Sequence, residues 1–66
     1  MKITLLQKKG KKQLKLKKGS TIKDVLKQEK VNVETIIPVL NKTVAHEKEK
    51  LSNADTLELL SAISGG

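Results

Sequence analysis

The sequence predicts an α+β domain in which one helix lies across one face of a mixed sheet of four to five strands. Three observations lead to this prediction. Apolar residues recur with a period of two in two N-terminal segments, one following segment has helical periodicity, and β-branched or apolar segments fill the C-terminal half. A chain of 66 residues builds one domain with one core.

The first two elements are expected to form a β-hairpin. Ile3 and Leu5 fall on one face of K-I-T-L-L-Q, and Leu14 and Leu16 repeat the period of two in Q-L-K-L-K. Gly10 lies between these segments, and we expect it in the loop of the hairpin.

One short helix follows the hairpin. Thr21 can cap this helix, and Asp24 stands three residues later in the capping-box position. Ile22, Val25 and Leu26 fall on one helical face, which we expect to pack on the sheet.

The C-terminal half is expected to supply the remaining strands. The stretch V-N-V-E-T-I-I-P-V-L-N is apolar and β-branched, but Pro38 cannot donate to a ladder, so its nitrogen should face an unpaired or bulged position. Asn41 and Lys42 predict a turn into a short strand, and S-N-A-D predicts another turn. T-L-E-L-L-S-A-I is the last strand, with Leu57 and Leu59 facing inward.

Composition excludes several classes of function. The absence of cysteine removes disulfides, thiolate metal sites and a cysteine nucleophile, and the absence of aromatic residues leaves an aliphatic core. No apolar run approaches the roughly 20 residues of a membrane span, and the N-terminus lacks the apolar stretch of a signal peptide. We expect a monomeric, cytoplasmic protein without a membrane partner. His46 is a lone histidine in a charged loop, so we expect no metal site and assign it no role.

The order of elements, the helix start T-I-K-D-V-L, V-L-N before a turn, and N-A-D-T-L-E-L-L-S-A-I-S-G-G together resemble the ubiquitin-like sulfur carriers of the ThiS and MoaD family and the related archaeal small modifier proteins. The resemblance spans essentially the whole chain. It implies a ubiquitin-like β-grasp domain over residues 1–64 and a flexible Gly-Gly tail at residues 65–66, which the last strand projects into an activating enzyme of the ubiquitin-activating type. We expect the first and last strands to be parallel neighbours. The chain departs from the family pattern at Pro38, which interrupts a strand, and at Lys42 and Ala54, where glycine is usual.

The Gly-Gly end suggests a chemistry for the terminal carboxylate. A carboxylate is a poor acylating agent until it attacks the α-phosphate of ATP and becomes an acyl-adenylate. The absence of a Cβ at Gly65 and Gly66 lets the backbone enter a narrow channel and approach a phosphate closely. The chain has no phosphate-binding loop, metal-ligand cluster or acid/base pair, so we expect it to be the substrate of an enzyme, with ATP and magnesium supplied by that activating enzyme.

Two outcomes of this activation remain open. A sulfur donor can convert the Gly66 adenylate into a thiocarboxylate for an acceptor enzyme, or a thiol and then a target-protein lysine can give an isopeptide. Thiamine synthesis, molybdopterin synthesis, transfer-RNA thiolation and protein conjugation are all open to the family. Lysines of this chain could themselves accept the isopeptide: Lys8, Lys9, Lys11 and Lys12.

Apolar residues outside the predicted core are candidates for docking the activating enzyme. Leu6 on the first strand and Leu60 and Ala62 on the last could form an outward patch, with Ser64 in the tail as a further contact. Ordinary exposed apolar surface is the equally weighted alternative.

Charge supports a rival hypothesis. Residues 1–30 hold eleven lysines and two acids, a net charge of +9, whereas residues 31–66 hold three lysines and five acids, a net charge of −2. The run K-K-G-K-K-Q-L-K-L-K-K could make the protein a small basic module that binds RNA or an acidic protein while the tail is inert. The absence of arginine and of aromatic rings limits such a module to weak backbone contacts, and a simply solvated surface is the third possibility.

Overall fold

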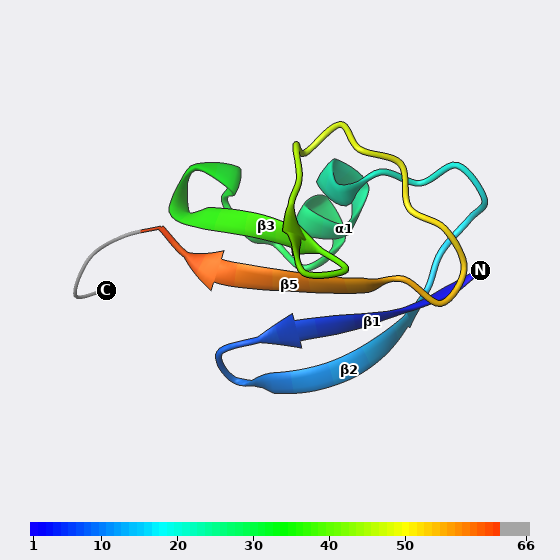
Figure 1. Cartoon of the computed structure of the whole chain (residues 1–66), viewed down its shortest axis with the longest axis horizontal. Coiled ribbons are helices and arrows are strands. Elements are labelled where there is room, and N and C mark those ends of the chain that lie inside the picture. The colour runs from blue at the N-terminus through cyan, green and yellow to red at the C-terminus, as the bar shows by residue number, and fades with distance from the viewer. Residues whose placement is uncertain (63–66) are drawn as a thin grey trace.

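A parallel pair of strands, β1 (Lys2–Gln7) and β5 (Thr56–Ser61), lies at the middle of the sheet (Figure 1). The structure is a computed structural model that describes residues 1–62. Over these residues five strands form one mixed sheet in the order β2-β1-β5-β3-β4, and every other pairing is antiparallel. The remaining strands are β2 (Gly10–Lys15), β3 (Ile36–Leu40) and β4 (Thr43–Val44). The predicted order of elements and the parallel pairing of the first and last strands are confirmed.

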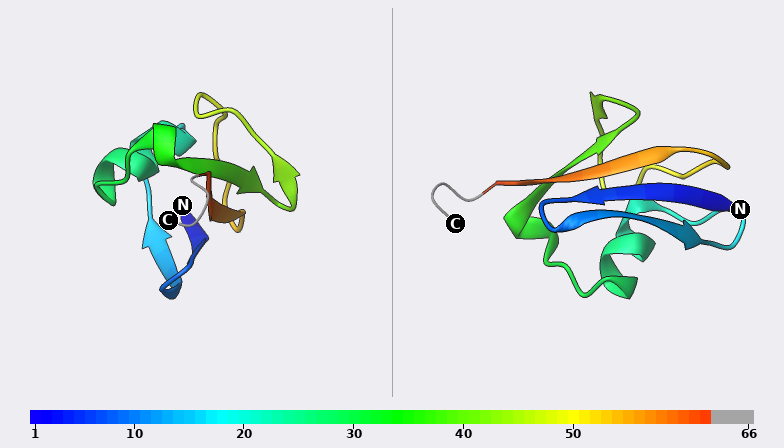
Figure 2. Two further views of the ribbon diagram at one scale, coloured as in Figure 1. Left: turned by 90° about the vertical axis from the view of Figure 1, so that its left-hand side faces the viewer. Right: turned by 90° about the horizontal axis from the view of Figure 1, so that it is seen from below.

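Helix α1 (Ile22–Gln28) packs against one face of this sheet, as the right-hand view of Figure 2 makes clear. The alternation of apolar residues along the strands and the apolar face of α1 enclose one aliphatic core. All but one of the residues predicted for the core are buried, and Leu16 packs on it half-buried. The buried cluster consists of Ile3, Leu5, Leu14, Ile22, Val25, Leu26, Leu51, Leu57 and Leu59.

The predicted capping box starts α1. The backbone N–H of Thr21 donates to Oδ2 of Asp24 at 2.9 Å, and the backbone N–H of Asp24 donates to Oγ1 of Thr21 at 3.4 Å. The hydrogen bond from the Thr21 backbone lowers the pKa of the Asp24 carboxyl below its ordinary value.

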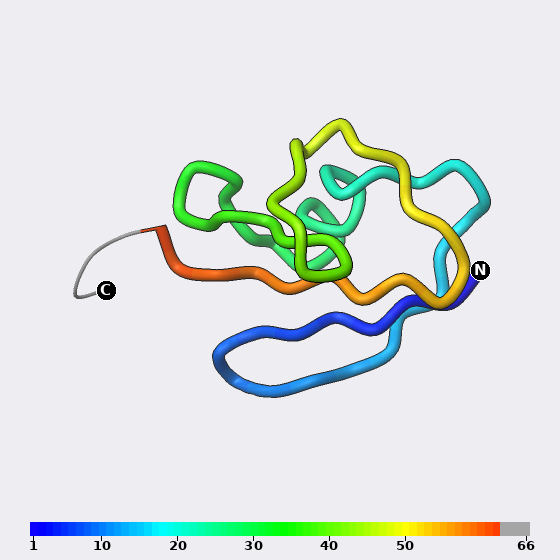
Figure 3. Tube along the Cα trace, in the orientation of Figure 1, coloured from blue at the N-terminus to red at the C-terminus, as the bar shows by residue number. Residues whose placement is uncertain are grey.

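The loop over residues 45–55 supplies further partners for the helix start, which it passes in Figure 3. The backbone N–H groups of Ile22 and Lys23 donate to the carbonyls of Glu49 and Glu47, at 3.0 and 2.8 Å. Two of the N–H groups that a helix leaves unpaired are thereby satisfied. The same loop buries Leu51, whose backbone N–H donates to the Ser20 carbonyl at 2.8 Å.

The hairpin differs from the sequence-based expectation in its register. Gly10 is the first residue of β2, paired with Gln7, and it is not part of the loop. Lys8 and Lys9 alone form the turn, and Gly10 follows with φ 142°, a conformation that glycine adopts at little cost. β2 ends at Lys15, one residue before Leu16, whose backbone N–H donates to the Met1 carbonyl at 2.7 Å.

The expected strand over 31–41 is wrong in its first part. Residues Val33–Thr35 form a 3₁₀ turn, and β3 begins only at Ile36. The Oδ1 atom of Asn32 accepts from the Glu34 N–H at 2.9 Å, and the Thr35 N–H donates to the Asn32 carbonyl at 3.0 Å. These local bonds offer the backbone an alternative to the ladder.

Pro38 sits in β3 without interrupting the sheet. Its carbonyl accepts from the Ala45 N–H at 3.0 Å, so the carbonyl points away from β5, toward the side of β4. In a strand the nitrogen of a residue points to the same side as its carbonyl. The Pro38 nitrogen therefore lies where β4 has already ended at Val44, as the missing donor requires.

Both predicted turns contain left-handed residues. Asn41 and Lys42 have φ angles of 49° and 70°, and they join β3 to β4. Ala54 has φ 72° in the turn before β5. Lys42 and Ala54 thus occupy conformations that suit glycine, at two of the three positions where the sequence departs from the family pattern.

No helix in the described part of the chain is long and apolar enough to cross a membrane.

Leu59 and Leu60 test the assignment of the two faces of β5. Leu59 is 7% exposed and Leu60 is 44% exposed. We expect Leu59→Ala to lower the free energy of unfolding by about 2–5 kcal/mol, because it leaves a cavity in the core. Leu60→Ala, the matched control, should change it by less than about 0.5 kcal/mol. Chemical denaturation measures both, and equal losses would contradict the assignment.

The capping box predicts a pH-dependent contribution to stability. Because the folded-state pKa of Asp24 is lowered, its stabilising contribution is present above the unfolded-state pKa and is lost as pH falls through the folded-state pKa. Asp24→Asn retains an acceptor oxygen but removes the charge. We expect the difference in unfolding free energy between the two proteins to be largest near about pH 7 and to vanish near about pH 2. A difference that does not change with pH would refute this role of Asp24.

Candidate functional site

Strand β5 leads the C-terminal residues out of the centre of the sheet. Its N-terminal half pairs with β1 as far as Leu6 and Glu58, and β3 continues the pairing to Ile36 and Ser61. Beyond the strand, the Ala62 N–H donates to the Thr35 carbonyl at 2.9 Å. The end of the chain is therefore anchored on the 3₁₀ turn up to Ala62.

The predicted tail residues Ser64, Gly65 and Gly66 lie outside the described residues, as does the last residue of the expected strand, Ile63. The boundary expected between residues 64 and 65 lies there too. Four residues follow Ala62, and a fully extended chain spans at most about 3.5 Å per residue. Four residues therefore span at most about 14 Å.

The face of the sheet opposite α1 carries an apolar patch, hereafter the outer patch: Leu6, Ile37, Leu60 and Ala62. Ile37 pairs with Leu60 in the ladder, and these side chains are 40% and 44% exposed. Leu6 is half-buried, and Ala62 is exposed at the end of β5. The structure thus gathers the predicted Leu6, Leu60 and Ala62 on one side of the sheet. Ile37 was missed, because its segment was expected to be a longer strand with no assigned faces.

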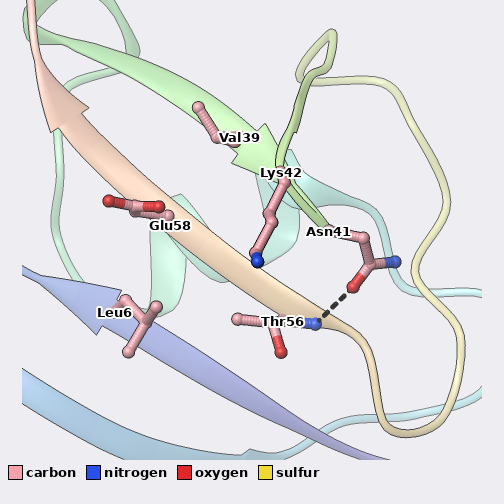
Figure 4. Close-up of a pocket in the computed structure, with 6 residues that line it drawn as sticks. All are labelled: Leu6, Val39, Asn41, Lys42, Thr56 and Glu58. Carbon is pink, nitrogen blue, oxygen red and sulfur yellow. Dashed lines mark hydrogen bonds between the residues drawn. The ribbon is translucent and has the colours of Figure 1, made fainter.

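A shallow groove of about 300 Å³ continues this face toward the β3–β4 turn. Figure 4 shows Leu6 on one side of the groove, Val39 on the other, and the Lys42 side chain reaching over β5 between Glu58 and Thr56. The groove thus combines apolar walls with one lysine and one carboxylate. A partner that docks here meets both charges beside the outer patch.

Asn41 fixes the start of β5 beside this groove. Its Oδ1 atom accepts from the Thr56 N–H at 2.9 Å, as the dashed line in Figure 4 marks, and its Nδ2 atom donates to Oδ1 of Asp55 at 3.0 Å. The other oxygen of Asp55 accepts from the Ser52 N–H at 2.7 Å. This network ties the β3–β4 turn to the turn before β5.

The four lysines proposed as isopeptide acceptors are all exposed. Lys8 and Lys9 form the hairpin turn, which lies at the same end of the sheet as the end of β5, the end that faces the viewer on the left of Figure 2. Lys11 and Lys12 follow in β2 and point to opposite faces. Lys12 forms an ion pair with Glu29 at the C-terminal end of α1.

The described residues contain no group of three or more His, Cys, Asp or Glu side chains that could hold a metal ion. His46 is exposed, and its Nδ1 atom accepts from the Lys48 N–H at 3.1 Å. This placement agrees with the solvated side chain expected for it.

The fold defines the class of the protein: a ubiquitin-like β-grasp domain in which the last strand lies in the centre of the sheet. The model of the ThiS family matches residues 4–66, and the chain belongs to this family. Carriers of the ThiS and MoaD type are small sulfur-carrier proteins rather than enzymes, and they act together with activating or sulfur-transfer enzymes.

Individual relatives agree with this assignment. The chain is 34% identical over 55 residues to the sulfur carrier protein TtuB of Thermus thermophilus, over 83% of this chain and 85% of TtuB. The crystal structure of SAMP1 from Haloferax volcanii matches with a TM-score of 0.79 at 15% identity, over 100% of both chains. The complex of subunits 1 and 2 of the molybdopterin-converting factor from Helicobacter pylori matches with a TM-score of 0.69 at 18% identity, over 100% of both chains. At these identities the two solved structures bear on the fold alone.

Asn41→Ala tests the network at the start of β5. It removes two hydrogen bonds, so we expect it to lower the free energy of unfolding by about 1–2 kcal/mol and to speed hydrogen exchange at the Thr56 amide. Lys42→Ala is the matched control, because Lys42 is also left-handed and its side chain makes none of these bonds. Equal losses in the two variants would assign the effect to backbone conformation and not to the network.

Proposed function

We propose that the Gly66 carboxylate of this sulfur carrier is adenylated by an activating enzyme of the ubiquitin-activating type. One carboxylate oxygen attacks the α-phosphate of ATP and pyrophosphate leaves, which produces an acyl-adenylate at Gly66. A sulfur nucleophile then attacks the Gly66 carbonyl and AMP leaves, so that one oxygen of the carboxylate is replaced by sulfur. ATP and magnesium belong to the activating enzyme, and the reaction takes place in the cytoplasm.

The observation that carries this proposal is the path of β5. The strand is held in the centre of the sheet and anchored by Ala62 to the Thr35 carbonyl, four residues before Gly66. A reach of at most about 14 Å requires the enzyme to dock close to the end of β5. The outer patch lies on β5 and its neighbouring strands, and its Leu60 and Ile37 supply exposed apolar side chains for a docking partner.

We therefore propose Leu6, Leu60 and Ala62, together with Ser64 in the tail, as contacts with the activating enzyme. Gly65 and Gly66 carry no Cβ, which allows the extended tail to enter a narrow channel beside the nucleotide. The exposed fractions of Leu60 and Ile37 support a patch that a partner covers.

The same acyl-adenylate permits the second branch of the proposal, the joining of Gly66 to a lysine amine. A thiol of the enzyme displaces AMP, and the lysine nitrogen then displaces the thiol, which forms an isopeptide bond. A second copy of this protein can supply the acceptor lysine. The candidates are the exposed turn lysines Lys8 and Lys9 and, in β2, Lys11 and Lys12. Family membership favours a working tail over the alternative of a basic module with an inert tail.

The experiment is intact-mass spectrometry of the protein incubated with ATP, magnesium, a sulfide source and the activating enzyme from the same cells. The full chain should form the adenylate and exchange one oxygen for sulfur, whereas a variant without Gly66 should stay unchanged. The mass of the protein isolated from its own cells checks that Gly66 is its last residue. A competent enzyme that leaves the full chain unmodified, or modifies the shortened one equally, contradicts the proposal.

Two further variants test the docking surface in the same assay. Leu60→Ser should slow activation roughly tenfold, since buried apolar side chains dominate interface energies. Val44→Ser is the matched control, because Val44 is 69% exposed on the strand farthest from the hairpin. Equal activation rates for the two variants would mean that the enzyme does not dock on the outer patch. That result would leave the chemistry proposed for Gly66 untouched.

A further inference from the structure

Strand β2 forms one edge of the sheet and carries a row of exposed lysines. Residues 1–23 contain no acidic residue. The lysine edge, as we name it, comprises the turn before β2, the strand itself and the loop after it: Lys8, Lys9, Lys11, Lys12, Lys15, Lys17 and Lys18.

Most of this charge is not neutralised within the molecule. Among residues 1–62 the one ion pair joins Lys12 to Glu29. Lys11 and Lys15 extend from the face opposite α1, while Lys12 lies on the face of the helix. Six residues at about 3.4 Å each give β2 a length of about 20 Å, so the charges form a continuous strip and not a point.

Lysines also protect edge strands from pairing with other chains. Charged side chains on the strand itself do this, and Lys11, Lys12 and Lys15 lie on β2. Protection of the edge does not account for Lys8, Lys9, Lys17 and Lys18, which lie outside β2.

The composition of the lysine edge favours one kind of partner. Protein interfaces are depleted in lysine and enriched in arginine and aromatic residues, and this chain has no arginine and no aromatic residue. A phosphate backbone requires only a series of cations. From this combination we infer that the lysine edge binds the phosphate backbone of nucleic acid without reading its sequence.

Sequence-independent binding follows from the same residues. Base edges are read by bidentate arginine or amide contacts, and single-stranded bases stack on aromatic rings. The lysine edge offers ammonium groups, and Gln13 of β2 is the single amide among them, which is too little to read a sequence, so affinity comes mainly from the release of counterions. We expect dissociation constants of about 10⁻⁴ to 10⁻⁶ M at physiological salt.

The lysine edge reaches the end of the molecule from which the tail extends. Lys8 lines a groove with Leu59 and Ser61 of β5. A nucleic acid bound along β2 therefore passes near the end of β5. This inference does not depend on the proposed function, since a chain without Gly65 and Gly66 retains every residue of the lysine edge.

Fluorescence anisotropy with labelled oligonucleotides tests the inference over a range of salt concentrations. The probes are two RNAs of unrelated sequence and one DNA duplex. We compare the triple variant K11Q/K15Q/K17Q with the matched control K42Q/K48Q/K50Q, which removes the same charge from exposed positions outside the lysine edge. Lys12 is left intact in both variants because of its ion pair with Glu29. Circular dichroism checks that both variants are folded.

The wild-type protein and the chain lacking Gly65 and Gly66 should bind both RNAs equally, with affinity that falls steeply with salt. K11Q/K15Q/K17Q should reduce the slope of log K against log salt by about 2 to 3, whereas the control variant should change it by less than about 1. Binding to the DNA duplex with the same dependence supports the same backbone chemistry.

Three results would overturn the inference. Equal weakening by the two triple variants would mean that net charge alone matters. Competition by polyglutamate as effective as RNA at equal charge would assign the lysine edge to an acidic protein instead. Absence of binding at low salt would leave the strip as solvated surface.

Discussion

The parallel pairing of β1 with β5 is the interaction on which the other features depend. Leu5 and Leu57 are paired in this ladder, and both are fully buried beneath α1. The pairing joins the first strand of the chain to the last, so it closes the sheet only when almost the whole sequence is in place. Because the two strands are parallel, the C-terminal ends of β1 and β5 lie at the same end of the sheet. The hairpin turn, the outer patch and the exit of the C-terminal residues are neighbours for this reason (Figure 1).

The core that stabilises this domain is small and aliphatic. Without aromatic rings, nine aliphatic side chains supply the buried cluster, and a domain of this size buries only about 60% of its unfolded surface. Local devices therefore matter: the capping box at Thr21, the carbonyls that Glu47 and Glu49 offer to the start of α1, and the Asn41 network. The first two sets of bonds fix the start of α1, and the Asn41 network fixes the start of β5. They leave the face of the sheet opposite α1 available to a partner.

Local signals in the sequence predicted the helix start, both turns and the order of elements, because each rests on a few adjacent residues. Thr21 and Asp24 are three positions apart, and Asn41 precedes its own turn. Burial that depends on distant segments was not predictable in this way. Leu51 is buried because its loop returns to Ser20, and Val39 because it is paired between Glu58 of β5 and Val44 of β4. The 3₁₀ turn forms in place of a strand because the Asn32 side chain accepts a local hydrogen bond from the backbone. A single side-chain contact of this kind leaves no periodic pattern in the sequence.

At the candidate site, the sequence predicted the residues but not their arrangement. Leu6 and Leu60 are 54 positions apart, and only the ladder register places Leu6 beside Glu58, two residues before Leu60. The register also brings the two surfaces together at one point, because Lys11 of β2 pairs with Leu6 of β1 and both lie on the face opposite α1. The lysine edge follows β2, while the outer patch lies on β1, β5 and β3. Leu60 on β5 and Ile37 on β3 lie two and three strands away from β2, so a polyanion bound along β2 would leave these two side chains uncovered. The two proposals thus use different strands of one sheet: the activating enzyme would contact the outer patch on β1, β5 and β3, and the nucleic acid would follow β2.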